Sequence, residues 1–354
     1  MKRLVIFALL CILCVEPSMG AELPIPGLNQ LWEQAESYGV EEGSDIERGL
    51  SNLLVDGTRQ IKTLLKSSLV TAVKLLIVVL LCGLAESAQG ETGGQGLQAV
   101  TIAGALAITA LTMTDMAAMI GLGWETIGKM RGFSEILLPV MAILTAATGG
   151  VSSAAVRQGA TVLFSQLLIT LMDHLLIPML YAYVAVSCAY TVVGNSGLNK
   201  LAGLLKSAVT FLLTALLLAF VGYLTASGAI AGSADASAIK ATKMAISRAI
   251  PVVGGILADA SESVLAGAGA LRGAVGAVGL VVVLAICLTP FLHLALQYLV
   301  YKVTGALCAT VAQGKLSQLI DAIGSAFGLV LGMTGAGALM LLVSIVSAIM
   351  AVTS

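Results

Sequence analysis

Several ionisable side chains in the apolar parts of this sequence lie close to a proline. They are Glu135, Asp173, His174, Asp259, Glu262, Arg272 and His293, and the prolines are Pro139, Pro178, Pro251 and Pro290. A charged group is costly in hydrocarbon, so each of these side chains is expected to face a bundle interior, a water-filled cavity or an interface. Helices interrupted at matching positions of two repeats are a pointer to a substrate or ion site. The predicted chemistry is therefore the passage of an ion or solute.

Asp173 and His174 are adjacent and offer a proton relay, because histidine titrates near neutral pH. Adjacent residues of a helix do not face one another, so the pair lacks the four-residue spacing of a shared ligand set. The alternative is that both are polar side chains without a role in passage. We keep the pair as candidate pathway residues.

Motifs of enzymes and cofactor sites are missing from the sequence. It has two histidines and no paired His-Glu metal motif, and Gly254-Gly255 lacks the strand, the spacing and the lysine of a phosphate loop. Beyond the first twenty residues, Cys82, Cys188, Cys287 and Cys308 lie singly in apolar segments. We expect no enzyme activity, no metal, no cofactor and, without a basic tract, no nucleic acid.

The stretch 239–280 holds the densest group of candidates. It begins with apolar residues at helical spacing and bases at other positions, which predicts an amphipathic helix. Pro251 lacks a backbone donor and disfavours helix before it, so a bend or break is predicted there, ahead of a Gly/Ala-rich run that permits close helix contact. The candidates in this stretch are Lys243, Pro251, Gly254, Gly255, Asp259 and Arg272.

Composition places these residues in a membrane. Of the 354 residues, 58% are hydrophobic and 10% are charged, and the mean hydropathy is +1.02. These values are typical of a polytopic membrane protein. Spans are predicted near 68–85, 97–119, 136–148, 160–177, 179–193, 204–230, 274–296 and 329–352. The less apolar stretches 251–270 and 303–323 are predicted to be short, re-entrant or interfacial segments.

The first residues have the features of a secretory signal. Lys2 and Arg3 precede an apolar core and small residues stand before Ala21, so 1–20 is predicted to be a signal peptide, with an uncleaved anchor as the alternative. Residues 21–66 carry apolar side chains on one helical face, which predicts an extracytoplasmic helical segment. That segment contacts a partner, the membrane surface or the chain's own bundle.

Charges near the first span conflict with an extracytoplasmic location of residues 21–66. Cleavage places residue 21 outside, whereas Lys62, Lys66 and Lys74 favour an inside location for the same end of the span. We expect the signal peptide to decide, because lysine side chains can extend to the headgroup region.

An internal duplication is indicated by the spacing of prolines and lysines. Pro139 and Pro178 are 39 residues apart, and the same pair recurs 112 residues later. The run 200–205 resembles 315–320 at an offset of 115, although chance matching of apolar sequence is the alternative. The predicted organisation is first transmembrane helices over 67–125, membrane repeat 1 over 126–235 and membrane repeat 2 over 236–354. Whether each copy has an odd or an even number of spans decides whether the copies are inverted or parallel.

Several runs resemble the stage III sporulation protein AE family. They are KATKMAISRAIPVVGGILADASESVLAGAGALRGAVGAVG, LLPVMAILTAATGG, LIPMLYAYVAVS and KLSQLIDAIGSAFGLVLGM. The similarity covers most of residues 50–354, and its most specific part runs from Pro251 to Asp259 with Lys240 and Lys243 upstream. The resemblance implies a polytopic protein of spore-forming bacteria, located in the mother-cell membrane around the forespore.

The resemblance also implies partners. Members of the family work with other stage III sporulation proteins of their operon, including a cytoplasmic ATPase and a ring-forming membrane protein, and with a forespore-side partner of the channel. The resemblance implies no catalytic residues for this chain. By position it points to Lys243, Pro251, Gly254, Gly255, Asp259 and Arg272 as structurally or functionally special.

We therefore expect an all-α polytopic integral membrane protein with an internal duplication and Pro/Gly-broken helices. The expected function is a channel or permease-like component of the secretion-like complex between mother cell and forespore. A self-sufficient secondary transporter of a small solute or ion, and a structural membrane scaffold for the ATPase and ring proteins, are the alternatives. Replacing Pro251 or Gly255 with leucine is expected to impair assembly or passage by straightening the break.

Overall fold

The computed structural model describes residues 25–38, 46–89, 94–249, 254–311 and 315–350, which are almost entirely helical and contain no strand. The helices are α2 (Leu28–Ser37), α3 (Ile46–Gln89), α4 (Gly94–Ala147), α5 (Val151–Leu171), the π-helix η1 (Met172–Leu176), α6 (Ile177–Val193), α7 (Ser196–Ala249), α8 (Gly254–Val311) and α9 (Lys315–Met350). This confirms the predicted all-α fold class. The predicted signal peptide, 1–20, lies outside the described residues.

Six helical stretches of the described chain are long and apolar enough to cross a membrane. They are Leu64–Ala88, Gln98–Ala147, Val151–Val193, Ser196–Ala241, Ala266–Thr310 and Lys315–Met350. Large apolar side chains cover the outward faces, as Leu84 on α3 (66% exposed) and Phe211 on α7 (70% exposed) illustrate. Such faces are stable against lipid and not against water, so the protein is a polytopic integral membrane protein, as predicted.

The predicted division into eight spans is wrong. The expected spans 97–119 and 136–148 are parts of the single helix α4, and 160–177 and 179–193 both lie within Val151–Val193. The stretch 303–323 is not re-entrant, because it comprises the end of α8 and the beginning of α9. The dips in hydropathy between these predicted spans are not loops, because in a long helix a polar residue can lie on a covered face without ending the helix.

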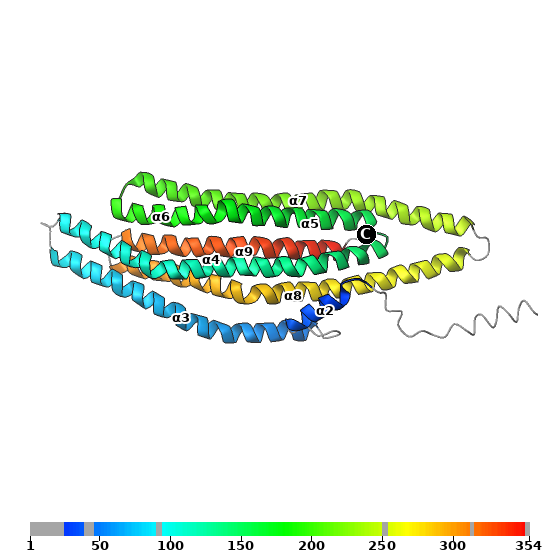
Figure 1. Ribbon diagram of the computed structural model, residues 1–354, viewed down its shortest axis with the longest axis horizontal. Coiled ribbons are helices and arrows are strands. Elements are labelled where there is room, and N and C mark those ends of the chain that lie inside the picture. The colour runs from blue at the N-terminus through cyan, green and yellow to red at the C-terminus, as the bar shows by residue number, and fades with distance from the viewer. Residues whose placement is uncertain (1–24, 39–45, 90–93, 250–253, 312–314, 351–354) are drawn as a thin grey trace, which may run out of the picture.

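The six long helical stretches lie side by side and alternate in direction (Figure 1). The described ends of the pairs α3–α4, α6–α7 and α8–α9 meet at one end of the bundle, and those of α4–α5 and α7–α8 meet at the other end. α8 and α9 are the most buried, and α3 and α7 flank the bundle. The chain reverses its direction after α6 and again after α7. The continuous segment α5–α6 and the helix α8 therefore run in the same direction, and α7 and α9 both run in the opposite one.

Two of the expected proline breaks are absent. Pro139 lies inside α4 and Pro290 inside α8, and both helices continue through the proline. A full break in lipid would leave several backbone groups unpaired, whereas a proline within a continuous helix frees only one carbonyl. At Pro178 the helix remains continuous but is π-helical immediately before it, over η1. The fourth site, Pro251, lies outside the described residues.

Glycines and one distant carboxylate set the turns. Gly149 (φ +88°) ends α4, and the Asp235 carboxylate of α7 accepts the Ser152 and Ser153 N–H groups at 3.0 and 2.9 Å, which caps α5. Gly194 (φ +75°) ends α6 with a hydrogen bond from its N–H to the Tyr190 carbonyl at 2.7 Å. These turns fix how the helix pairs meet.

Candidate functional site

A polar cavity of the described chain lies between α6, α7, α8 and α9, close to the α6–α7 and α8–α9 connections. Its volume is about 490 Å³, and exposed residues such as Asn199 and Gln318 form part of its wall. Polar residues that line it are Tyr183, Ser187, Tyr190, Thr191, Asn199, Lys206, Lys302, Ser317, Gln318, Asp321 and Ser325. We call it the four-helix pocket.

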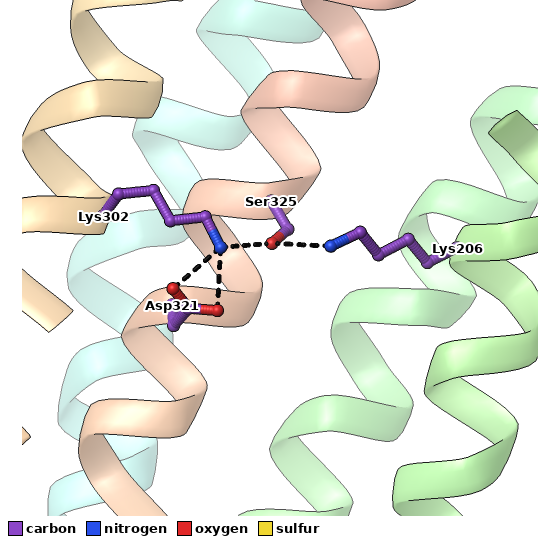
Figure 2. Close-up of polar contacts among 4 residues, drawn as sticks. All are labelled: Lys206, Lys302, Asp321 and Ser325. Carbon is purple, nitrogen blue, oxygen red and sulfur yellow. Dashed lines mark hydrogen bonds and ion pairs between the residues drawn. The ribbon is translucent and has the colours of Figure 1, made fainter. Parts of the chain in front are cut away.

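A cluster of charges crosses the four-helix pocket (Figure 2). The Lys302 Nζ of α8 lies 2.7 and 2.8 Å from the two carboxylate oxygens of Asp321 on α9, and it donates to the Ser325 Oγ at 2.8 Å. From the opposite side, the Lys206 Nζ of α7 donates to the same Oγ at 3.2 Å. The Ser325 hydroxyl therefore links two ammonium groups that come from different helix pairs.

Small residues bring α8 and α9 close enough for this pairing. A Cβ on Gly305 would lie 3.2 Å from the Asp321 backbone nitrogen, and a Cβ on Gly324 would lie 3.0 Å from the Tyr301 Cβ. Close backbone approach at small residues is a common way to join helices in membranes. Gly305 and Gly324 have no side chain, so α8 and α9 approach closely, and Lys302 can reach Asp321.

The α6 wall of the four-helix pocket presents hydroxyl groups that already bond within their own helix. The Ser187 hydroxyl donates to the Tyr183 carbonyl at 2.7 Å, and the Thr191 hydroxyl donates to the Ser187 carbonyl at 3.0 Å. Their oxygens remain able to accept from a bound group. The wall is therefore polar without carrying charge.

The two sides of the four-helix pocket come from corresponding positions of α6–α7 and α8–α9. Lining residues that are 115 positions apart are Ser187 and Lys302, Tyr190 and Gly305, Thr191 and Ala306, Ala202 and Ser317, Gly203 and Gln318, and Lys206 and Asp321. This offset is the one that relates the runs beginning at Lys200 and Lys315. The predicted duplication, which stays a prediction, would place the four-helix pocket between its two copies.

The chemistry of the four-helix pocket is that of charge recognition. It contains two ammonium groups and one carboxylate, and Lys206 has no acidic partner among the residues described. An ammonium group can donate three hydrogen bonds, so Lys206 retains donors for an anion. No group of three His, Cys, Asp or Glu side chains in the described ranges is placed to hold a metal ion.

A second polar network joins α3, α4 and α8 deeper in the bundle. Ser68 donates to the Gln297 side-chain oxygen at 2.7 Å, and the Gln297 amide donates to the Asp115 carboxylate at 3.3 Å. The Tyr301 hydroxyl also donates to Asp115, at 3.0 Å. Tyr301 precedes Lys302, so α8 carries this network on one side and the four-helix pocket on another.

The structure brings none of the sequence-predicted residues into the four-helix pocket. Pro139, Asp173, His174 and Pro178 are exposed on α4, η1 and α6. Pro290 is buried within α8. Arg272 is 4% exposed, and it donates to the Thr148 hydroxyl at 3.1 Å and to the Ile349 carbonyl at 3.0 Å, near the opposite end of the bundle.

The other candidates lie partly or wholly outside the described part of the chain. Lys243 belongs to α7 and Asp259 to α8, but the positions of their side chains are not described. Gly254 and Gly255 form the first turn of α8, and Pro251 lies in the segment before it. Their predicted roles remain predictions.

Sequence reasoning missed Lys206, Lys302 and Asp321. The signal that identifies two of them is the spacing around the α8–α9 connection, because Gly305 lies as far before it as Asp321 lies after it, and Lys302 lies about one helical turn before Gly305. In an antiparallel hairpin, positions equidistant from the turn face each other. The prediction of a re-entrant segment over 303–323 concealed that hairpin.

These features define a class of protein: a polytopic, all-helical membrane protein with a charged pocket between two helix pairs. The profile of the stage III sporulation protein AE family matches residues 44–353. The chain therefore belongs to the stage III sporulation protein AE family, as its resemblance implied.

A characterised relative is similar over part of the chain. It is the stage III sporulation protein AE of Bacillus subtilis (strain 168), which is 24% identical over 213 residues. That similarity covers 60% of this chain and 53% of the relative, so the chain spans about half the length of the relative it matches. No solved structure matches the chain.

Proposed function

We propose that this chain is a channel or permease-like membrane component of the complex between mother cell and forespore that endospore development requires. The observation that supports the proposal is the four-helix pocket, in which charged side chains are gathered between corresponding positions of α6–α7 and α8–α9. Charged groups inside a membrane bundle mark solute or ion pathways, and sites between repeats are typical of transport proteins.

The charges indicate what the four-helix pocket binds. Lys302 is already paired with Asp321, whereas Lys206 forms its one hydrogen bond within the described chain with the Ser325 hydroxyl. The free donors of Lys206 favour an anionic group, either on a solute or on a side chain of a partner.

The exposed pair Asp173 and His174 supports action within an assembly. Both lie near the middle of the apolar stretch Val151–Val193 and are exposed. Ionisable groups at that depth are unfavourable against lipid, so in the membrane this face is expected to meet protein or water. We assign it to contact with another protein of the complex, which agrees with the proposed ATPase, ring-forming and forespore-side partners.

The proposal is tested by charge removal in a spore-forming host whose own copy is deleted. We expect Lys206→Gln and Lys302→Gln each to lower the yield of heat-resistant spores by about tenfold or more, since each removes a charged hydrogen bond. Lys129→Gln is the control, because Lys129 pairs at 2.8 Å with the exposed Glu125 outside the pocket. Parental spore yields in both pocket variants at normal membrane levels would exclude the pocket from function.

The alternative of a self-sufficient secondary transporter rests on the same pocket but needs no partner. Purified protein in liposomes that moves an anionic solute, with loss of movement in Lys206→Gln, would favour the transporter. A scaffold predicts instead that pocket variants assemble and sporulate normally.

A further inference from the structure

Two buried arginines lie at the end of the bundle opposite the four-helix pocket, and neither has an acidic partner among the described residues. Arg157 on α5 is 8% exposed and Arg272 on α8 is 4% exposed. Arg157 donates through Nε to the Ser347 hydroxyl at 2.9 Å, and Arg272 donates to the Ile349 carbonyl, two residues further along α9. The nearby Asp235 carboxylate instead caps α5 through Ser152 and Ser153.

Their hydrogen-bonding capacity is not used up. The Arg157 Nη1 and the Arg272 Nε are buried and have no hydrogen-bond partner within the described chain. A buried guanidinium N–H without an acceptor is unfavourable even where the other N–H groups are paired, so an external acceptor is expected.

Arg157 lines a groove of about 450 Å³ between α7 and α9. Its guanidinium lies at the Gly228 and Ser347 level, since its Nη2 is 3.5 Å from where a Gly228 Cβ would be. The rest of the groove is mainly apolar and runs toward Leu224 and Leu342. The cationic end of the groove suits the anionic headgroup of a lipid, and its apolar remainder suits the acyl chain.

The depth of the groove fits a lipid. Ser347 is near the last residue of the span Lys315–Met350, and Arg157 is near the first residue of Val151–Val193. Arginines at the ends of spans lie at the headgroup level, where phosphate is abundant, and guanidinium binds phosphate through two parallel hydrogen bonds.

We propose that the α7–α9 groove binds one anionic phospholipid, with its phosphate on Arg157 and an acyl chain along Leu224 and Leu342. Arg272 adds positive charge to the same end of α9. This site is separate from the four-helix pocket and does not depend on the proposed conduit.

The test measures the melting temperature of the purified full-length protein in uncharged detergent with added phosphatidylglycerol, phosphatidylcholine or inorganic phosphate. We expect phosphatidylglycerol to raise the melting temperature, phosphatidylcholine to raise it less and inorganic phosphate to leave it unchanged. Arg157→Gln should weaken phosphatidylglycerol binding by about tenfold or more, since a charged hydrogen bond is lost. Lys200→Gln, at the other end of the bundle, should leave binding intact.

A second variant keeps the test decisive if Arg157→Gln fails to fold. Val346→Trp leaves both arginines in place and fills the groove from its partly exposed side. It should therefore also abolish the rise in melting temperature that phosphatidylglycerol causes. A rise that persists in Val346→Trp, an equal rise with phosphatidylcholine, or no rise in the parent protein would overturn the proposal. An equal rise with inorganic phosphate would show a free-anion site and overturn the assignment to a lipid.

Discussion

At the residue scale, the charges of the four-helix pocket contribute more to recognition than to stability. The side chains of Lys302 and Asp321 are 26% and 53% exposed, so solvent screens their attraction. Arg272, in contrast, is buried and donates to two oxygens. The two sites should therefore respond differently when a charge is removed.

Replacing Lys302 with methionine should lower the free energy of unfolding by about 1 kcal/mol or less, because a half-exposed ion pair is weak. The spore yield should nevertheless fall as far as in Lys302→Gln. Thermal unfolding of the purified protein and a spore count measure the two effects. A loss of stability large enough to explain the spore defect would make Lys302 a structural residue.

Replacing Arg272 with methionine should lower the free energy of unfolding by about 2 to 4 kcal/mol, because the Thr148 hydroxyl and the Ile349 carbonyl lose their charged donor. The control is Arg131→Met, since Arg131 forms an exposed pair with Glu135 at 3.1 Å. Melting temperatures in one detergent compare the two variants. Equal shifts would contradict the structural role of Arg272.

The sequence indicated that ionisable residues in apolar segments matter, but it did not show which of them meet. Arg272, which is expected from its charge to avoid lipid and lies in the family-like run, is buried. Lys206 and Asp321 are 115 residues apart and become neighbours only through the packing of two hairpins. Local patterns carry no information on that packing, whereas the polytopic all-α class follows from composition and was predicted correctly.

At the element scale, small residues and not proline breaks shape the bundle. Gly305 and Gly324 set the approach of α8 to α9, and Gly279 would place a Cβ 2.9 Å from Leu137 on α4. The helix-break prediction failed at Pro139 and Pro290 because tertiary packing and the need to pair backbone groups in lipid outweigh local proline preference. Sequence alone does not reveal this balance.

Replacing Gly305 with alanine should lower the free energy of unfolding by about 1 to 3 kcal/mol, because the added methyl group meets the Asp321 backbone. Gly222 is the matched control, since a Cβ there meets nothing within 4 Å and alanine favours helix. Gly222→Ala should be neutral or stabilising. Thermal unfolding of both purified variants measures the difference. A Gly305→Ala protein more stable than the parent would contradict the close α8–α9 contact.

At the scale of the whole molecule, the helices are longer than a bilayer requires. α4 has 54 residues and α8 has 58, whereas about 20 residues cross the hydrocarbon core. Parts of the helices therefore extend beyond the membrane or the helices are tilted. In Figure 1, the end of α7 and the beginning of α8 project past the other helices, and both belong to the family-like run 240–279.

The arrangement also predicts the orientation of the protein. Bases lie at both ends of the bundle, because Lys200, Lys206, Lys302 and Lys315 lie near the α6–α7 and α8–α9 connections and Arg157, Lys240, Lys243 and Arg248 lie toward the other end. Their distribution therefore does not decide the orientation, and the predicted signal peptide does. α2 lies toward the other end of the bundle, where a cleaved signal peptide would place it outside (Figure 1). Lys62 and Lys66 lie at the beginning of the apolar stretch Leu64–Ala88 and oppose this orientation, but lysine side chains can extend to the headgroup region. The four-helix pocket would then open toward the cytoplasm.

Cysteine labelling with a membrane-impermeant maleimide tests this orientation. Ala88→Cys and Asn195→Cys, at the pocket end of the bundle, should react only after the cells are permeabilised, whereas Val151→Cys and Met350→Cys should react in intact cells. All four positions are exposed, and the parent protein gives the background from its own cysteines. Labelling of Ala88→Cys or Asn195→Cys in intact cells would place the pocket outside. Labelling of Asn195→Cys and Val151→Cys from the same side would contradict the crossing of α5–α6 itself, and with it the parallel relation of the two helix pairs that enclose the pocket.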